Sequence, residues 1–286
     1  PIVKCEKELV VIKSVSEYEE GKINLISLNN MTDNYEFGKV QSNCGKAAYE
    51  FIEAAIRQAL AGNIDAVVTG PINKEALNSS GIHYSGHTEI FADLTGTKTY
   101  AMMLVGGPMR VIHVSTHVSL REACDRVKKD RVYKVISLAH TALLGLGIKK
   151  PRIGVAGLNP HSGENGLFGT EEINEVIPAI EQAKEKGMDV TGPIPPDTAF
   201  LHCKNGKYDI IVAMYHDQGH IPLKMEDFME GVNITVGLPI IRTSVDHGTV
   251  FGKAGKGTAD ETSMIRAVEM AIKFSINRTV NASGMD

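Results

Sequence analysis

Three histidines stand directly after short apolar runs of the sequence, where their imidazoles could hold a metal ion. Each lies in a polar loop behind such a run: His117 after residues 110–115, His161 after residues 152–156 and His216 after residues 209–214. In open α/β sheets, ligands bind at the carboxyl ends of the strands. Three imidazoles at that edge match a catalytic zinc-type site, which has three protein ligands and one open position. The alternative is that each is an ordinary polar loop residue, and the pattern alone leaves both interpretations open.

Acidic and amide side chains lie beside these loops and could orient the imidazoles through hydrogen bonds. They are Asn159, Glu164, Asp197 and Asp217. Taken alone, each carboxylate is explained better by a solvated loop or a helix cap. Further histidine candidates are His83, His87 and His220, whereas His113 falls in a strand pattern and His140 in a helix pattern.

A second group of residues is basic and polar, and it suits an anion. Lys224, Asn233 and Arg242 follow His216 along the chain. We expect Arg242 to begin a loop, Arg242-Thr-Ser244, that could hold a phosphate or carboxylate by its fork geometry and hydroxyls.

Gly86-His-Thr-Glu89 precedes a helical pattern, so its amides and Thr88 could bind an anion at a helix N-terminus. A capping box formed by Thr88, with Lys and Arg on the surface, explains these residues equally well.

The usual nucleotide fingerprints are missing. The sequence contains neither G-x-G-x-x-G after a strand nor G-x-x-x-x-G-K-[ST]. The candidate replacement is His247-Gly248-Thr249, followed by a glycine-rich stretch over residues 252–257. Glycines let the backbone approach a ligand closely, which suits a dinucleotide, although a flexible surface loop has the same composition.

These residues need strands and helices to position them, and the hydrophobic pattern predicts both in alternation. The expected strands are Glu8–Lys13, Ile23–Ser27, Asp65–Thr69, Tyr100–Val105, Arg110–Ser115, Arg152–Ala156, Asp209–Met214 and Val232–Val236. The expected helices are Gly45–Ala61, Asp130–Leu146, Glu171–Lys186 and a last helix that ends near Phe274, with a capping box at Thr258 and Glu261. Gly192–Pro196 is expected to be a rigid turn. Such alternation predicts an α/β protein with helices on both faces of a parallel or mixed sheet.

A glycine- and lysine-rich stretch before Pro151 is the best candidate for a junction between domains. It predicts an N-terminal α/β lobe over residues 1–147 and a C-terminal α/β lobe over 148–286, with chain exchange between the lobes as a further possibility. The chain begins at Pro1 rather than Met, which predicts processing or a longer parent chain.

Composition excludes several classes of protein. Of the 286 residues, 43% are hydrophobic and 22% charged, and the net charge is −4, which argues against disorder and against a strongly basic nucleic-acid surface. No apolar run is long enough for a membrane span, no secretory signal opens the chain, and the four cysteines form no C-x-x-C pair. We therefore expect a cytoplasmic protein that binds neither nucleic acid nor membrane.

Seven segments together resemble the 4-hydroxythreonine-4-phosphate dehydrogenase family, including its D-threonate/D-erythronate 4-phosphate branch. They are Val67–Lys74, Gly86–Glu89, Val114–His117, Gly157–Glu164, Ala213–Gly219, Gly231–Thr235 and Gly237–Thr249. The resemblance runs in order from about Gly38 to Phe274. It implies a two-lobed α/β/α fold like that of isocitrate and isopropylmalate dehydrogenases, and a homodimer.

The resemblance also implies roles for individual residues. A divalent metal (Zn, Mg, Mn or Co) would be held by His117, His161 and His216, with His216 expected from the partner subunit. Among the carboxylates beside these loops, we expect Asp197 and Asp217 to support the metal ligands. A phosphorylated substrate would contact His87, Thr88, Lys224, Asn233 and Arg242. NAD would lie against His247, Gly248 and Thr249.

The implied reaction, in a family that serves pyridoxal phosphate synthesis, is oxidation of the hydroxyl-bearing carbon by NAD followed by loss of CO2. His87 and Lys224 are both candidates for the proton transfer, and the sequence leaves the choice open. Asn165–Phe168 and Gly219–Lys224 look more like the D-threonate/D-erythronate 4-phosphate branch than the vitamin branch.

One family feature is missing, and two other functions compete with this one. Nothing in residues 1–39 resembles the opening Gly-Asp-Pro-x-Gly-Ile-Gly-Pro-Glu loop of the family, so we expect either part of a longer chain or loss of that loop. The histidines alone would also suit a zinc hydrolase with a metal-activated water. The missing loop would also suit a non-catalytic homologue that binds phosphorylated ligands.

Overall fold

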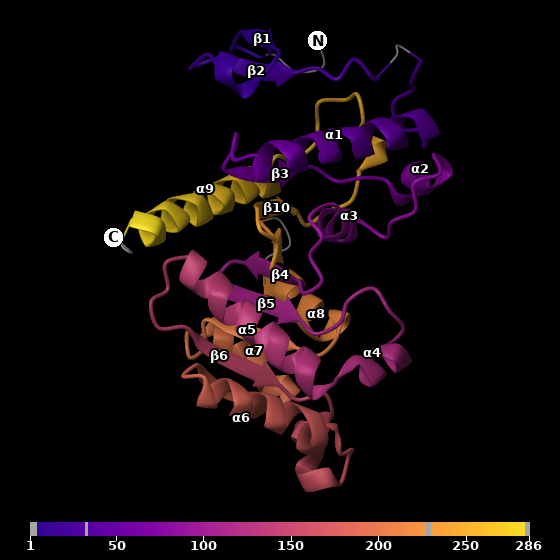
Figure 1. The fold of residues 1–286 in the computed structure, drawn as a ribbon. Coiled ribbons are helices and arrows are strands. Elements are labelled where there is room, and N and C mark those ends of the chain that lie inside the picture. Colours follow the sequence, from indigo (N-terminus) through magenta and orange to yellow (C-terminus); the bar gives the residue numbers. More distant parts are fainter. Residues whose placement is uncertain (1–4, 32–33, 227–229, 284–286) are drawn as a thin grey trace.

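A single mixed sheet of eight strands forms the centre of the molecule (Figure 1). The computed structural model describes residues 5–31, 34–226 and 230–283. The strand order is β3-β10-β9-β4-β5-β8-β6-β7. The strands are β3 (Ala66–Thr69), β4 (Ala101–Gly106), β5 (Met109–His113), β6 (Arg152–Ala156), β7 (Asp189–Ile194), β8 (Ile210–Ala213), β9 (Val232–Val236) and β10 (Ile241–Val245). Two more, β1 (Leu9–Ile12) and β2 (Ile23–Ile26), pair with each other in parallel, apart from this sheet.

Strand direction changes along the sheet. β5, β8, β6 and β7 are parallel neighbours, as are β3 and β10. The three remaining pairs, β10 with β9, β9 with β4, and β4 with β5, are antiparallel. Because β5, β8 and β6 point the same way, the loops after them leave from one edge of the sheet. His117 and His161 lie in the segments after β5 and β6, and His216 follows β8 as the first residue of α8, so all three lie at the edge that the sequence predicted.

Helices cover both faces of the sheet because alternate side chains of its strands point to opposite sides. In β4, Met103 packs against the face that α5 and α6 cover, and Leu104 packs against the face that α7 and α8 cover. The helices are α1 (Ser42–Leu60), α2 (Lys74–Ser79), α3 (His87–Leu94), α4 (Leu120–Arg126), α5 (Lys129–Gly145), α6 (Ile177–Glu185), α7 (Pro196–Lys204), α8 (His216–Glu226) and α9 (Thr262–Ser283). A π-helical turn, Glu172–Val176, precedes α6. Within the described residues, no helix is both long and apolar enough to cross a bilayer.

All eight predicted strands are present, and the predicted helices correspond to α1, α5, α6 with its π-helical turn, and α9. The α/β fold class is confirmed. The capping box was wrong: α9 begins at Thr262, whose amide donates to the Asp260 carboxylate over 2.9 Å, rather than at Thr258.

Two strands, β7 and β10, were missed. Residues 192–194 belong to β7, so the rigid turn predicted over Gly192–Pro196 was wrong. Proline is tolerated there because β7 is the edge strand of the sheet. β10 was predicted as a loop because Arg242, Thr243 and Ser244 are consecutive polar residues, yet all three are buried.

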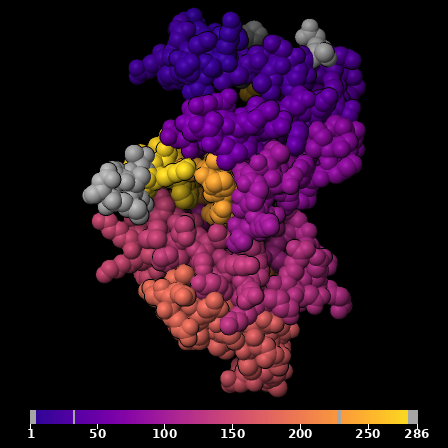
Figure 2. Space-filling view, in the orientation of Figure 1, coloured from indigo at the N-terminus to yellow at the C-terminus, as the bar shows by residue number. Residues whose placement is uncertain are grey.

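Segments from the two ends of the chain are interleaved. β10 and β9 lie between β3 and β4 in the sheet, and α9 packs against β10 and β3. In Figure 2 the yellow and orange C-terminal segment lies between the purple upper part and the pink lower part of the molecule. The domain boundary near residue 147 stays a prediction. The position of β9, β10 and α9 beside N-terminal strands corresponds to the chain exchange between lobes that we named as a possibility.

Candidate active site

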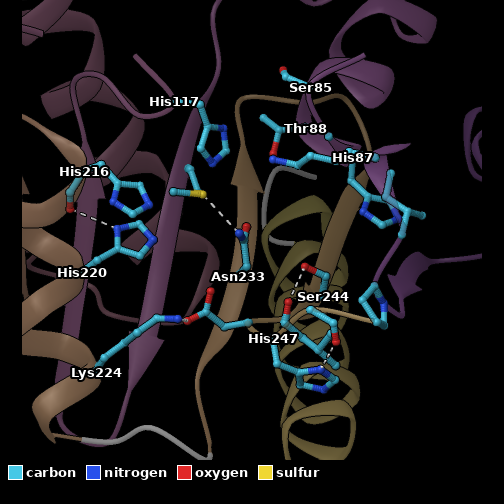
Figure 3. Close-up of a pocket in the computed structure, with 18 of the residues that line it drawn as sticks. Ser85, His87, Thr88, His117, His216, His220, Lys224, Asn233, Ser244 and His247 are labelled. Carbon is cyan, nitrogen blue, oxygen red and sulfur yellow. Dashed lines mark hydrogen bonds and ion pairs between the residues drawn. The ribbon is translucent and has the colours of Figure 1, made fainter. Parts of the chain in front are cut away.

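A cleft of about 710 Å³ lies over the middle strands of the sheet, with α3 on one side and α8 on the other. Figure 3 shows the imidazoles of His117, His216 and His220 on one wall, and His87 and Thr88 on the facing wall. Ten of the thirteen predicted site residues line it: His87, Thr88, His117, His216, Asp217, Lys224, Asn233, Arg242, His247 and Gly248. His161, Asp197 and Thr249 lie outside it.

The floor of the cleft is built from alternate residues of neighbouring strands. Asn233 of β9 is in register with Ser244 of β10, and Met102 of β4 lies beside them. Met102, Asn233, Arg242 and Ser244 line the cleft because side chains two apart on a strand share one face. The Asn233 amide donates to the Met102 sulfur over 3.1 Å.

Arg242 is the buried cation of the site, with 2% of its surface exposed. Its guanidinium donates to the Thr235 hydroxyl over 3.1 Å and to the Thr69 hydroxyl over 2.8 Å, and it lies 5.4 Å from the Phe91 ring centroid. Burial lowers its pKa to about 9, and the nearby Glu89 carboxylate acts in the opposite direction. A buried cation in contact with neutral groups is stabilised by an anionic ligand.

Three buried polar atoms on residues of the cleft have no hydrogen-bond partner within the described structure. They are Arg242 Nε, Asn233 Oδ1 and Glu89 Oε2. Leaving a buried polar group unpaired costs roughly 1–3 kcal/mol, so such groups mark places where a ligand or water completes the pairing. The set includes a donor and two acceptors, which fits a substrate that carries both anionic and hydroxyl groups.

His87 is held as a neutral imidazole. Burial lowers its pKa to about 3, and the Arg242 cation contributes in the same direction. His87 is the first residue of α3, and Gly86 precedes it at the N-terminal cap. A histidine with so low a pKa is a weak proton acceptor, but it can still form hydrogen bonds with a ligand.

Lys224 is the second cation of the cleft. Its Nζ lies 3.4 Å from the Asp246 carboxylate, which follows β10. Burial raises the pKa of Asp246 above its usual value, while the Lys224 charge acts to lower it. Figure 3 shows the Lys224 side chain reaching along the cleft from α8.

The histidine wall is a set of rings in mutual contact. The His117 and His216 centroids lie 5.9 Å apart, and His216 stacks on His220 at 3.5 Å. The buried ring of His113 lies 4.7 Å from that of His220. Burial lowers the pKa of His117, His220 and His113, to about 4 for His220 and about 3 for His113. They are therefore neutral at pH 7, the state in which imidazole binds a metal.

Of the two predicted supporting carboxylates, Asp217 contacts a histidine and Asp197 does not line the cleft. The Asp217 carboxylate accepts from His216 Nδ1 over 2.7 Å. Asp197 is exposed in the first turn of α7. Of two other candidates from the sequence, Asn159 supports the loop after β6 by donating to Glu171 and Glu172, whereas Glu164 is exposed in that loop.

His161 is separated from the other two predicted metal ligands. A turn with left-handed backbone angles carries it to the surface, where its ring lies 6.2 Å from that of Phe168. The described part of the chain contains no group of three His, Cys, Asp or Glu side chains placed to hold a metal. Of the three predicted ligands, one chain brings His117 and His216 near each other. The contribution of a ligand by a partner subunit stays a prediction.

The predicted cofactor residues lie across two adjoining cavities. His247 and Gly248 line the cleft, and Thr249 lines a neighbouring cavity of about 320 Å³; both cavities are bounded by Pro71 and Ile72. At Gly255 φ is +73°, and a Cβ there would lie 3.0 Å from the Phe37 ring. Glycine is thus required where this loop packs on Phe37.

Comparisons with known proteins identify the family of the chain. The family described as "Pyridoxal phosphate biosynthetic protein PdxA" matches residues 3–271. The chain belongs to the PdxA family. A D-threonate 4-phosphate dehydrogenase of Salmonella typhimurium is 53% identical over 240 residues, which cover 84% of this chain and 73% of that protein.

Solved structures extend this result to the fold. A crystal structure of 4-hydroxythreonine-4-phosphate dehydrogenase from Klebsiella pneumoniae superposes with a TM-score of 0.86 at 47% identity, covering 94% of this chain and 82% of that one. A β-decarboxylating dehydrogenase from Thermococcus kodakarensis has a TM-score of 0.50 at 13% identity, covering 86% and 76% of the two chains, which indicates a shared fold. The PdxA-family chain therefore has the isocitrate/isopropylmalate-dehydrogenase-like architecture that we predicted.

Several residues in or beside the cleft were not predicted. Asp246, Glu89 and Thr235 belonged to segments that we quoted, but none was given a role; Thr235 lies beneath the cleft as a partner of Arg242. Met102 lacked any signal, because it resembles an ordinary strand residue. His220 was only a further candidate. A periodicity argument on α8 could have found it, because residues four apart lie on one helix face, as His216 and His220 do.

Proposed function

We propose that this chain is an NAD- and divalent-metal-dependent dehydrogenase that oxidises and decarboxylates a 4-phosphorylated hydroxy acid, with D-threonate 4-phosphate as the first candidate substrate. The observation that carries the proposal is Arg242, a buried cation with an unpaired Nε on the floor of a cleft that has histidines along one wall. Such a cleft suits an anionic substrate at one end and a metal at the other.

Different side chains of the cleft would bind different groups of the substrate. Arg242 and Lys224 would hold the phosphate and carboxylate of the substrate, and Asn233 would bind a hydroxyl between them. Thr88 and the neutral His87, both in the first turn of α3, would add hydrogen bonds from the facing wall. Two fixed cations at separate points of the cleft select a substrate with two anionic ends.

The metal proposal rests on the donors that are present. His117 and His216 lie on one wall of the cleft, while His161 is exposed in the left-handed turn after β6. We therefore propose a homodimer in which His117 and His216 of one chain and His161 of the partner subunit hold one Zn, Mg, Mn or Co ion. Asp217 would fix the orientation of the His216 ring through its hydrogen bond to Nδ1.

When bound, NAD accepts a hydride and the divalent cation polarises the oxygen on the carbon being oxidised, which prepares the loss of CO2. The NAD would lie along His247, Gly248 and Thr249, which span the two adjoining cavities. Lys224, paired with Asp246, would donate the proton to the carbon left by decarboxylation. His87 is the weaker candidate for proton transfer because its pKa is lowered to about 3.

The choice of substrate rests on relatives and on two segments of the sequence. The Salmonella typhimurium relative is named for D-threonate 4-phosphate, while the similar Klebsiella pneumoniae structure is named for 4-hydroxythreonine 4-phosphate. These substrates differ at C2, where one has a hydroxyl and the other an amine. The neutral His87 and the Asn233 amide favour a hydroxyl, because the positive charges of Arg242 and Lys224 in the cleft repel an ammonium group.

The direct test follows NADH absorbance with purified protein, NAD and divalent metal, in parallel with D-threonate 4-phosphate, D-erythronate 4-phosphate and 4-hydroxythreonine 4-phosphate. We expect NADH formation that a chelator abolishes, fastest with D-threonate 4-phosphate. Release of inorganic phosphate without NADH would instead support the zinc hydrolase. Tight binding of all three compounds without turnover would support the non-catalytic homologue.

A further inference from the structure

The loop that carries His161 has an unusual backbone. Five consecutive residues, 161–165, have φ between +43° and +82°, and only Gly163 among them is a glycine. L-residues avoid this left-handed region, and a run of five is a full turn of the disfavoured hand. Neighbouring groups must therefore hold the turn in place.

One buried carboxylate holds the start of this turn. Glu172 is 1% exposed, and its Oε1 accepts the backbone amides of Leu158 and Asn159, each over 2.7 Å. Its Oε2 accepts the Asn159 side-chain amide over 2.9 Å. A single carboxylate thus pairs with three donors in the segment that leads from β6 into the turn.

The turn packs directly on the same carboxylate. A Cβ at Gly163, where φ is +82°, would lie 2.7 Å from Glu172 Oε2, and a Cβ at Gly169 would lie 2.5 Å from the Asn159 side chain. Both positions therefore require glycine. Glu172 itself opens the π-helical turn Glu172–Val176, an irregularity that is frequent at functional sites.

We propose that Glu172 is a positioning residue that keeps the His161 turn in its left-handed form, so that the imidazole is presented to a second subunit before any metal arrives. The inference rests on the proposed function, in which the partner subunit uses this histidine. Glu172 lies behind the turn and contacts neither substrate nor cofactor residues of the cleft. It acts by pairing the partly buried amides of Leu158 and Asn159, which would otherwise lose these acceptors.

The chain supplies a matched control. Glu175 lies three residues further along the same π-helical turn, and its carboxylate also accepts a backbone amide, that of Lys129, over 2.7 Å, and pairs with Lys128 at 3.3 Å. Those contacts lead to α5 and do not involve the His161 turn. Glu172→Ala, Glu172→Gln and Glu175→Ala, each in the full chain, therefore separate a local effect on the turn from a general loss of stability.

The first measurement is amide hydrogen exchange over residues 158–168, and it needs neither metal nor substrate. We expect Glu172→Ala to speed exchange there by at least tenfold relative to Glu175→Ala when both are compared at equal distance below their melting temperatures. Glu172→Gln keeps one carbonyl acceptor and should fall between Glu172→Ala and wild type. If Glu172→Ala fails to fold, the Gln variant against Glu175→Ala still decides the matter. Equal exchange in the turn for the Glu172 and Glu175 variants overturns the proposal.

The second measurement is zinc affinity by competition with a chromophoric chelator. Removing a group that orients a metal ligand weakens binding by about 10- to 100-fold. We expect that loss for Glu172→Ala and none for Glu175→Ala. Faster exchange in the turn with unchanged zinc affinity would keep the positioning role but refute the partner's use of His161. Slow exchange in the turn with weakened zinc affinity would refute the positioning role.

Discussion

The Lys224 ammonium and the Asp246 carboxylate face each other across the candidate active site at 3.4 Å. Lys224 comes from α8, and Asp246 follows β10, so this ion pair joins one wall of the cleft to the floor. Asp246 is mostly buried, and burial raises its pKa. The pair therefore exists only when the pH is above that raised pKa.

Asp246→Asn should lower kcat/KM by about 10- to 100-fold, the effect of roughly 1–3 kcal/mol in transition-state binding, because Lys224 loses the partner that orients it. In the wild type, activity should fall on the acid side as Asp246 takes up a proton, at a higher pH than for an ordinary aspartate, because its pKa is raised. A pH profile of kcat/KM checks this. An acid limb that persists unchanged in Asp246→Asn would show that another group controls it.

His87 links stability to pH. Its pKa is about 3 in the folded protein, whereas an unfolded histidine titrates near its ordinary value of 6.5. As pH falls below 6.5, the unfolded chain binds a proton that the folded chain does not, so stability is lost. The change due to His87 is about 2 kcal/mol between pH 7 and pH 5.

His87→Gln should remove that contribution, so the variant should lose less stability than the wild type on acidification. Urea unfolding at both pH values measures the difference, and His140→Gln, a change in the partly exposed helix α5, serves as the control. Parallel losses in wild type and His87→Gln would mean that His87 is not held neutral.

At Arg242, substrate binding and protein stability make opposite demands. Its charge is buried beside neutral hydroxyls, so the ligand-free protein bears a desolvation cost. Arg242→Gln should therefore leave the melting temperature equal to or above that of wild type. Substrate affinity should fall by at least about 100-fold, because a charge-assisted pair with the ligand is lost. Thermal unfolding and calorimetric titration together test this, and a markedly lowered melting temperature would assign Arg242 a structural role.

Subunit complementation tests which histidine of the proposed metal site comes from the partner subunit. His117→Ala and His161→Ala chains, each inactive alone, should regain about a quarter of wild-type activity when co-expressed. Half of the dimers are then mixed, and each mixed dimer has one intact site. His117→Ala with His216→Ala should stay inactive, because those two side chains line the cleft of one chain. Activity from the His117→Ala and His216→Ala pair, without activity from the His117→Ala and His161→Ala pair, would show that His216 is the ligand from the partner subunit.

The sequence predicted most of the fold because strands such as Arg152–Ala156 are apolar and β-branched between polar loops. β10 was not predicted as a strand because its central residues, Arg242-Thr-Ser244, are polar. They are buried through tertiary hydrogen bonds, including that from the Thr243 hydroxyl to the Ala267 carbonyl over 2.8 Å. No local pattern reports such burial, because it depends on a helix that follows in the chain.

Most of the candidate site could also be predicted, since motif and strand-end position together place a side chain at one edge of the sheet. The strands before His117, His161 and His216 do end together, as expected. The sequence could not show that His161 then turns away, because a left-handed turn of mainly non-glycine residues contradicts local propensity, and the segment before it pairs with Glu172 on another element.

Oxidative decarboxylation releases one NADH and one CO2 for each substrate molecule, so the ratio of these products is the decisive measurement. With D-threonate 4-phosphate, NAD and a divalent metal, NADH absorbance and released 14CO2 from C1-labelled substrate would be followed in one reaction. We predict equal amounts of NADH and CO2, with the phosphate still attached to the product. NADH without CO2, or free phosphate without NADH, would contradict it.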